Sequence, residues 1–320
     1  MKLSIIIASF NTKNLTRSCL SSIYKYPPKG TFEIIVIDNA SKDGSVQMIK
    51  KEFPKVKLIE NNKNLGFAKA NNLGVKIAKG EFILLLNSDT KVLKTSIDFL
   101  VDYLKDHPDV GVATSKLQKP DGSTQYYYHR RFPTFFSFVS SVLEHYFGLA
   151  NPFAKKYFML DSKLDRETKI EQAAGTVFAT KKEVISKIGG LFDHKLPLFF
   201  NDSDFCKRVK DHSLKVILLP QASVIHLGGK STDLLDPYVL REELFVSMLY
   251  YFRKHRQFLS YALSKISIIM LLPMIFLLTT FGIPKSYFEA PIDKKKSSLV
   301  KQAKIFLAVI IERRQISDFN

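Results

Sequence analysis

Acidic side chains and one histidine stand close behind the apolar runs that the sequence pattern marks as strands. The clearest case is the all-apolar run 83–86, which leads into Asn87-Ser88-Asp89. Asp38 follows the run 34–37, His226 follows 224–225, and Asp202 comes shortly after the mostly apolar residues 196–200. In open α/β sheets, ligands bind outside the carboxyl ends of the strands. Carboxylates and an imidazole gathered there suit a metal-assisted site for a phosphate-bearing substrate.

The elements that must position these side chains alternate between strand and helix patterns, which predicts a parallel sheet. In the first half we expect strands at 3–8, 33–37, 56–59, 81–86 and 110–113, and helices at 11–23, 44–53, 66–78 and 95–105. In the second half we expect strands at 172–179, 216–219 and 223–226, and helices at 182–188 and 202–209. The stretch 118–168 is irregular, aromatic and basic. It fits a binding loop or lid and a local hydrophobic subcore equally well.

Composition narrows the class of protein. The 320 residues are 46% hydrophobic, enough for a substantial core, and the net charge of +18 favours a polyanionic partner. No nucleic-acid-binding motif is recognisable, so a phosphorylated substrate or an anionic lipid is favoured over nucleic acid. The two cysteines, Cys19 and Cys206, are best interpreted as small core residues in a reducing compartment. The chain opens directly on a strand pattern, with no secretory signal evident.

The C-terminal region changes character after residue 232. A helix is predicted at 236–256 and another at 304–311, and residues 266–284 carry no charge. These uncharged residues would span ~28 Å as a helix, marginal for a bilayer core of ~30 Å. Because basic residues flank both sides, we favour a segment that lies in the membrane plane or re-enters it. A single transmembrane span and a soluble core helix are the alternatives.

Seven ordered motifs carry a resemblance to a known family. They are Ser4–Asn11, Val36–Ser45, Asn64–Gly74, Leu86–Asp89, Gly189–Asp193, Asn201–Asp204 and His226–Gly229. Together they resemble the inverting family-2 glycosyltransferases with a GT-A fold, especially the rhamnosyltransferase-like branch. The resemblance implies an α/β fold with a Rossmann-like, mostly parallel central sheet flanked by helices. It places a GT-A domain at 1–232, with a nucleotide-sugar half at 1–115 and an acceptor and catalytic half at 116–232. Residues 233–320 would form a helical, basic, membrane-associated region.

By resemblance, the first half binds the nucleotide sugar. Asp38 would accept a hydrogen bond from the N3–H of uracil or thymine, although an acid there also suits a cap on the following turn. Gly66 would allow close backbone approach to the ligand, although ordinary turn chemistry is the alternative. The full set of nucleotide-sugar-binding residues implied is Ser9, Asn11, Asp38, Asn64, Gly66, Asn87, Ser88 and Asp89.

The resemblance also implies a divalent cation, Mn²⁺ or Mg²⁺, held by Asp89 and His226. Hard oxygen donors suit either ion, and an imidazole suits Mn²⁺ at least as well as Mg²⁺. The chain departs from the family's Asp-any-Asp pattern at Asn87, so Asp89 is the only carboxylate committed there. His226 could instead be a strand-end histidine held by an ordinary hydrogen bond.

Asp202 is the predicted general base, at the position where the family carries the second acid of a Glu-Asp pair. Asn201 replaces the first acid. Asp204 could orient the acceptor or the sugar, and Arg130 and Arg131 could meet the diphosphate or an anionic lipid acceptor. The alternatives are that the two acids only stabilise the start of their helix, and that the arginines form a solvated basic face.

The resemblance therefore implies transfer of a sugar from a UDP- or dTDP-sugar, such as dTDP-rhamnose, to a hydroxyl of a glycan or polyprenyl-linked acceptor. The site of action would be the cytoplasmic face of the cell membrane, against an anionic surface. The departures at Asn87 and Asn201 keep open a non-catalytic scaffold that binds nucleotide sugars. A sugar-1-phosphate nucleotidylyltransferase is disfavoured, because residues 9–13 contain no glycine for a phosphate loop.

Overall fold

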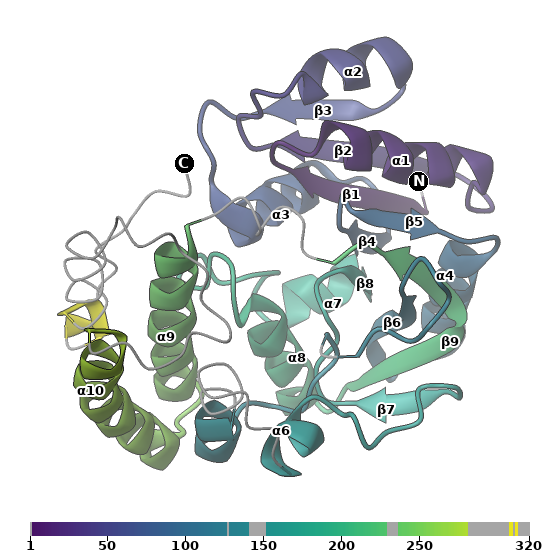
Figure 1. The fold of residues 1–320 in the computed structure, drawn as a ribbon. Coiled ribbons are helices and arrows are strands. Elements are labelled where there is room, and N and C mark those ends of the chain that lie inside the picture. The colour runs from purple at the N-terminus through teal and green to yellow at the C-terminus, as the bar shows by residue number, and fades with distance from the viewer. Residues whose placement is uncertain are drawn as a thin grey trace. The chain divides into compact units, whose positions relative to one another are not determined.

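The computed structural model describes residues 2–126, 128–140, 152–228, 236–280, 307–309 and 311–312. The chain divides into two compact units (Figure 1). The first comprises residues 1–132 and 156–234, and the second comprises 133–155 and 235–319. The predicted domain boundary at 232 falls among residues 229–235, outside the described part of the chain.

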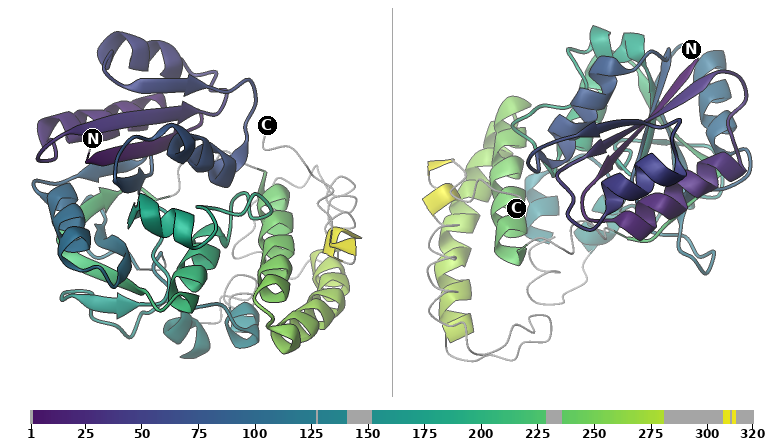
Figure 2. Two further views of the ribbon diagram at one scale, coloured as in Figure 1. Left: turned by 180° about the vertical axis from the view of Figure 1, so that it is seen from behind. Right: turned by 90° about the horizontal axis from the view of Figure 1, so that it is seen from above.

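The first unit is built on one mixed sheet, which Figure 2 shows from two further sides. Its strand order is β3-β2-β1-β4-β8-β6-β9-β5, and β7 pairs with β9. Its strands are β1 Leu3–Ser9, β2 Phe32–Asp38, β3 Lys57–Glu60, β4 Phe82–Leu86, β5 Thr90–Val92, β6 Val110–Gln118, β7 Thr168–Ile170, β8 Val177–Lys181 and β9 Lys215–His226. Its helices are α1 Lys13–Lys25, α2 Ser45–Glu52, α3 Gly66–Ile77, α4 Ser96–Asp106, α6 Pro152–Tyr157, α7 Lys182–Lys187 and α8 Asn201–Asp211. The start of α6 belongs to the second unit.

The half that contains β3, β2, β1 and β4 is parallel throughout. Alternate residues of β1 enter opposite layers of the core. Ile5 and Ile7 pack with α1, α2 and α4, whereas Ile6 packs with α3, α7 and α8. A strand covered on both faces is apolar throughout, which explains why residues 3–8 form a continuous apolar run. The four parallel strands therefore end at one edge, and Ser9 stands beside Asp38 in register.

The other half is mixed. β8 runs antiparallel to both β4 and β6, and β9 runs parallel to β6. The two strands predicted at 216–219 and 223–226 are one strand, β9, and the three-residue strand β5 was not predicted. The strand predicted at 172–179 is also corrected, since β8 begins only at Val177 and residues 172–176 form a loop.

The second unit is helical where it is described. Residues 135–140 are helical, α9 spans Pro237–Lys254 and α10 spans Phe258–Thr280. Residues 281–284 of the predicted uncharged segment lie outside the described residues, and so does most of the helix predicted at 304–311. In the part of the chain that the structure describes, no helix has the length and apolar content needed to cross a bilayer. The single transmembrane span therefore finds no support there.

Candidate functional site

Pairing of the short strand β5 with the end of β9 brings two predicted metal ligands together. Thr90 pairs with His226, and the backbone N–H of Leu227 donates to the carbonyl oxygen of Asp89 at 3.0 Å. The Nε2 atom of His226 lies 3.4 Å from Oδ1 of Asp89, and both side chains are almost fully buried. Residues 137 positions apart in sequence thus meet through a single antiparallel ladder.

The ring of His226 is held by neighbours from the aromatic segment. Its Nδ1 lies 2.8 Å from Oε1 of Gln125, and Tyr128 packs edge-on against the ring at a centroid distance of 4.6 Å. Since a side-chain amide oxygen only accepts, Nδ1 is the donor in this contact, and in the neutral imidazole the lone pair is then on Nε2. This Nε2 atom is buried and has no hydrogen-bond partner among the described residues.

These two side chains fit a divalent cation by their donor chemistry. A histidine that donates one ring N–H to an oxygen and presents the other nitrogen has the arrangement common to metal ligands. Within the described residues, no group of three or more His, Cys, Asp or Glu side chains could hold a metal ion. Asp89 and His226 therefore make up an incomplete ligand set that substrate oxygens would have to complete.

Asp38 lies at the carboxyl end of β2 and is 1% exposed. Its Oδ2 accepts a hydrogen bond from the backbone N–H of Ser41 at 2.8 Å, which is the capping contact weighed from the sequence. Its Oδ1 is buried without a hydrogen-bond partner in the described residues. An unpaired buried carboxylate oxygen costs stability, so its presence at a strand end is consistent with a ligand N–H that it would accept from.

The hydroxyl groups of Ser9 and Ser88 belong to a buried network. Thr12 bridges them, with its Oγ1 lying 3.1 Å from the Oγ of each serine, and Thr16 lies 2.9 Å from Ser9. Both serines are 2% exposed. Their side chains therefore tie β1 to the loop before Asp89, and direct contact of the two serines with the nucleotide stays a prediction.

Asn11, Asn64 and Gly66 shape the loops around this edge of the sheet. Asn11 has a positive φ of 50°, donates its N–H to Ser41 Oγ at 2.9 Å, and accepts from the N–H of Lys42 at 2.7 Å. The side chain of Asn64 accepts from the N–H of Gly66 at 3.0 Å. Gly66 has a φ of 76°, so its place at the start of α3 favours glycine. Contact of these residues with a nucleotide stays a prediction.

Asp202 lies in the first turn of α8 and contacts the loop 172–176. Its Oδ1 accepts from the N–H of Ser203 at 2.7 Å, and its Oδ2 accepts from the N–H of Gly175 at 3.2 Å. Burial of the carboxyl group raises the pKa of Asp202, against the opposing effects of the Arg130 charge, these N–H groups and a hydrogen bond from Gln172. A carboxylate with a raised pKa is a stronger proton acceptor, which is what a general base requires.

The loop 172–176 connects Asp202, the predicted general base, to the segment after β4 that carries the predicted metal ligand Asp89. Gly175 contacts Asp202, and the next residue, Thr176, accepts at its carbonyl oxygen from the N–H of Asn87 at 2.9 Å. The buried His129 accepts at Nδ1 from the N–H of Ala174 at 3.2 Å, and its Nε2 donates to the carbonyl oxygen of Ser115 at 3.0 Å. The loop is therefore fixed from three sides, and it lies between Asp202 and the residues preceding Asp89.

Arg130 lies close enough to this group for its charge to act on Asp202, whereas Arg131 makes its contacts elsewhere. The backbone of Arg130 forms a two-way bridge with Gln172, and its guanidinium lies over the rings of Tyr157 and Phe158 at 5.8 and 5.4 Å. Its charge acts on Asp202. Arg131 instead donates to the carbonyl oxygen of Lys156 and lies 3.8 Å from Asp161. Contact of either arginine with the acceptor or the diphosphate stays a prediction.

Asp204 has a structural contact in this fold. Its side chain is fully buried and accepts from Nε of Arg208 at 3.0 Å. The guanidinium of Arg208 also donates to the carbonyl oxygens of Ile188 and Gly190, at 3.0 and 2.8 Å. The Asp204 carboxylate thus fixes α8 to the turn after α7, and its contact with the acceptor or sugar stays a prediction.

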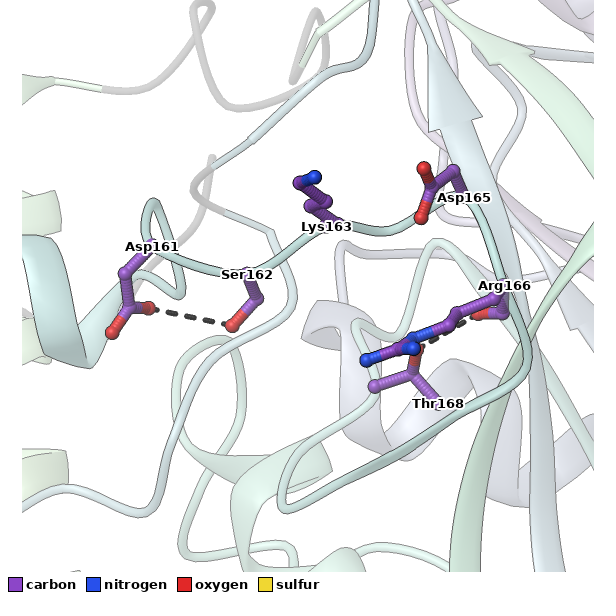
Figure 3. Close-up of a pocket in the computed structure, with 6 residues that line it drawn as sticks. All are labelled: Asp161, Ser162, Lys163, Asp165, Arg166 and Thr168. Carbon is purple, nitrogen blue, oxygen red and sulfur yellow. Dashed lines mark hydrogen bonds between the residues drawn. The ribbon is translucent and has the colours of Figure 1, made fainter.

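Two residues of the site were missed by sequence reasoning. Gln125 holds the imidazole of His226, and Gln172 donates to Asp202 while its own Oε1 is buried without a partner in the described residues. Neither follows an apolar strand, so the pattern that found the acids gave no signal for them. A broad surface hollow of 750 Å³, lined by Asp161, Ser162, Lys163, Asp165, Arg166 and Thr168, contains none of the predicted site residues (Figure 3).

The expected mostly parallel sheet is corrected, because four of its strand pairings in the described part of the chain are parallel and four are antiparallel. Acids at the carboxyl ends of its parallel strands and a histidine brought in by β9 are the arrangement of a GT-A-like α/β protein. The sequence profile described as Glycosyl transferase family 2 matches residues 4–189, more than half of the chain. The chain therefore belongs to glycosyltransferase family 2, and the predicted family and enzyme class are confirmed at that level. Family 2 members typically act with inversion.

Relatives and solved structures agree with this assignment. The N-acetylglucosaminyl-diphospho-decaprenol L-rhamnosyltransferase of Mycobacterium tuberculosis is 25% identical over 211 residues, covering 62% of this chain and 67% of that protein. The protein y4gI of Sinorhizobium fredii is 27% identical over 235 residues, covering 70% of this chain. A poly(ribitol-phosphate) beta-glucosyltransferase of Bacillus spizizenii is 40% identical over 94 residues, covering 28% of this chain. The matches span only 24% of y4gI and 15% of the glucosyltransferase.

Two solved structures show the same fold. A mannosyltransferase of Pyrobaculum calidifontis, in complex with GDP-Man and Mn²⁺, has a TM-score of 0.55 and 17% identity over 97% of this chain and 86% of that one. Residues 1–349 of TarS from Staphylococcus aureus give a TM-score of 0.51 and 16% identity over 97% of this chain and 81% of that one. At such identities the likeness establishes the fold alone.

Proposed function

We propose that this protein transfers a sugar, with inversion, from a uridine- or thymidine-diphosphate sugar to a hydroxyl group of a glycan or polyprenyl-linked acceptor. The supporting observation is a pair of buried acceptor atoms without partners in the described residues, Oδ1 of Asp38 and Nε2 of His226. Asp38 is the last residue of β2, and His226 is the last residue of β9. Oδ1 of Asp38 suits the N3–H of uracil or thymine. Nε2 of His226 suits a cation that would accompany a diphosphate.

In this proposal Asp202 performs the proton transfer. Its carboxylate accepts the proton of the acceptor hydroxyl as the oxygen forms its bond to the anomeric carbon. The bond from that carbon to the diphosphate oxygen breaks on the opposite face, and the electron pair leaves with the nucleoside diphosphate. Gln172 and the N–H groups of Ser203 and Gly175 hold the carboxylate in one orientation, so little reorganisation is needed at the moment of transfer.

Asp89 and His226 would hold the divalent cation, Mn²⁺ or Mg²⁺, which offsets the charge that develops on the departing diphosphate. Gln125 fixes the His226 tautomer that leaves Nε2 free to coordinate. Since Asn87 supplies no charge and Asp89 is the one carboxylate among the predicted ligands, we expect cation affinity to rise when the nucleotide adds its own oxygens.

The acceptor and the place of action rest on other observations. The relative from M. tuberculosis is named for a diphospho-decaprenol acceptor, and those from B. spizizenii and S. aureus are named for poly(ribitol-phosphate). All three names describe phosphate-bearing glycans or lipids of cell surface synthesis. The net charge of +18 favours such anionic acceptors. We place the enzyme at the cytoplasmic face of the cell membrane, against an anionic surface.

A donor screen tests the proposal. We expect thermal stabilisation by uridine or thymidine diphosphate sugars, increased by Mn²⁺, and release of the nucleoside diphosphate when an acceptor is present. Asp202→Asn should abolish turnover and leave donor stabilisation in place. Asp211→Asn, an exposed acid on the same helix, serves as the matched control and should retain turnover.

Three outcomes would count against this assignment. If no pair of donor and acceptor led to release of a nucleoside diphosphate, the proposed transfer activity would be refuted. Full turnover by Asp202→Asn would refute the assignment of Asp202 as the general base. Donor binding without turnover on any acceptor would instead favour the non-catalytic scaffold, for which the structure offers one supporting feature. Asn201, at the place of the family's first acid, is buried and donates to the carbonyl oxygen of Leu198 at 2.9 Å, as a structural amide does.

A further inference from the structure

The polarity of α10 is reversed relative to that of a helix on a water-exposed surface. Between Phe258 and Met270, every exposed residue is apolar. Leu259 and Met270 are 73% and 71% exposed, and Ile266 is 55% exposed. The remaining exposed positions are Phe258, Ala262 and Leu263. A surface helix in water normally shows charged and polar residues on its outer face.

The polar residues of this helix face the protein instead. Ser264 is fully buried, and its hydroxyl has no hydrogen-bond partner in the described residues. Lys265 donates to Glu312 at 2.6 Å, and Tyr261 also hydrogen-bonds to that carboxylate. Tyr261 and Lys265 are therefore paired within their own unit, so the exposed apolar side is not the result of a helix lacking a polar face.

Four of these six exposed apolar residues form one narrow stripe. At 100° per residue, Leu259, Leu263, Ile266 and Met270 lie within about 60° of one another around the helix axis. They extend along the axis for roughly 16 Å. Contiguous exposed apolar surface of this kind marks an interaction site. We refer to these four residues as the α10 stripe.

A basic cluster stands at the start of the stripe. Arg253, Lys254 and Arg256 are exposed, and Arg256 precedes Phe258 by two residues. Arg253 is also paired with Glu312 at 2.8 Å. A helix with an apolar face that enters the lipid and flanking cations that meet phosphates is the arrangement of segments that lie in the plane of an anionic membrane.

We propose that the α10 stripe binds an anionic lipid surface with α10 lying in its plane. The acyl chains would cover Leu259, Leu263, Ile266 and Met270, and lipid phosphates would meet Arg253, Lys254 and Arg256. The proposal does not rest on sugar transfer, because it concerns a face of the second unit and its test uses neither donor nor acceptor.

The chain contains no tryptophan, so a single introduced indole reports on the stripe without background. In Leu259→Trp, vesicles of phosphatidylglycerol and phosphatidylcholine should shift the emission to shorter wavelength, and brominated acyl chains should quench it. In the matched control Phe99→Trp, at a 45% exposed position on α4, the same vesicles should leave the emission unchanged. Vesicles of phosphatidylcholine alone should bind less, and added salt should weaken binding to the anionic vesicles.

A double substitution of the stripe tests its contribution to affinity. Leu263→Ser with Ile266→Ser should weaken partition onto anionic vesicles by at least about tenfold, because two half-exposed apolar side chains no longer enter the lipid. Ile77→Ser, at a 40% exposed apolar position in the first unit, should not change partition. Circular dichroism melting of each variant establishes that it is folded.

Two results would overturn the proposal. One is an indole at position 259 that is neither shifted nor quenched by anionic vesicles. The other is a wild-type protein that is dimeric by light scattering and becomes monomeric in the double variant, since a second copy of the chain would then cover the stripe.

Discussion

The replacement Asp38→Asn provides the sharpest test of the nucleotide site, because the two oxygens of this carboxylate do different things. Oδ2 caps the turn through the N–H of Ser41, and Oδ1 is buried without a partner in the described residues. The amide can keep the cap with its oxygen. Its NH₂ group then stands where Oδ1 stood, and a donor faces the N3–H of uracil instead of an acceptor.

The size of the effect follows from the loss of that one contact. A hydrogen bond to a charged group contributes about 1.5–3 kcal/mol, which corresponds to roughly a 10- to 150-fold loss of UDP affinity. The free energy of unfolding without nucleotide should change by less than about 1 kcal/mol, because the cap is retained and one unpaired buried group replaces another. Binding and stability should thus respond differently to the same substitution.

Isothermal titration with UDP and CDP measures this prediction directly. Cytosine has an unprotonated N3, which can accept from the NH₂ group of the variant, so we expect CDP affinity to hold or rise while UDP affinity falls. Glu60→Gln is the matched control, since Glu60 pairs with Asp38 in register at the end of β3 and is exposed. Equal losses for UDP and CDP, or no loss for UDP, would refute the assignment of Oδ1 to the base.

Two further predictions concern the histidines. Gln125→Leu removes the acceptor that fixes the tautomer of His226. The Mn²⁺ affinity, measured by titration in the presence of UDP, should therefore fall by about 10-fold or more. An unchanged Mn²⁺ titration would contradict the metal assignment. Burial lowers the pKa of His129 from 6.5 to about 4. The unfolded chain therefore binds a proton that the folded protein excludes, and stability should decline by about 3 kcal/mol as the pH falls from 6.5 to 4. Urea unfolding across this range should show a flatter pH dependence for His129→Asn than for the wild type, and parallel curves would contradict this account.

The parts of the fold and site that depend on local pattern were predictable from the sequence. Residues 83–86 are buried on both faces of the sheet, so they form an unbroken apolar run, and the first polar residues after it necessarily lie at the sheet edge. The same reasoning located Asp38. The α/β class follows from these repeats of strand, acid and helix, whereas the family was predicted from the resemblance carried by the seven ordered motifs.

The rest depends on pairings between distant segments. The strand β5 has only three residues, Thr90–Val92, one of them exposed, so it carries too little alternation to be recognised. Ala173 and Ala174 are buried and apolar like strand residues, yet the segment turns to offer Gly175 N–H to Asp202. Asp204 lies two positions after Asp202, so the sequence alone groups it with the predicted general base. On a helix, two positions turn a side chain through about 200°, which points Asp204 into the core toward Arg208.

The unpaired groups of the site suggest where ligand binding should be coupled to stability. Oδ1 of Asp38, Nε2 of His226 and Oε1 of Gln172 are all buried acceptors without partners in the described residues, and Asp202 is held with a raised pKa by burial. Each condition destabilises the ligand-free protein, and each would be relieved by a bound N–H, cation, hydroxyl or proton. Because a ligand that binds only the folded state adds its binding free energy to stability, donor and cation together should stabilise the first unit more than either does alone. The proposed substrate is in this sense the missing part of the polar network at the carboxyl ends of β2, β4 and β9.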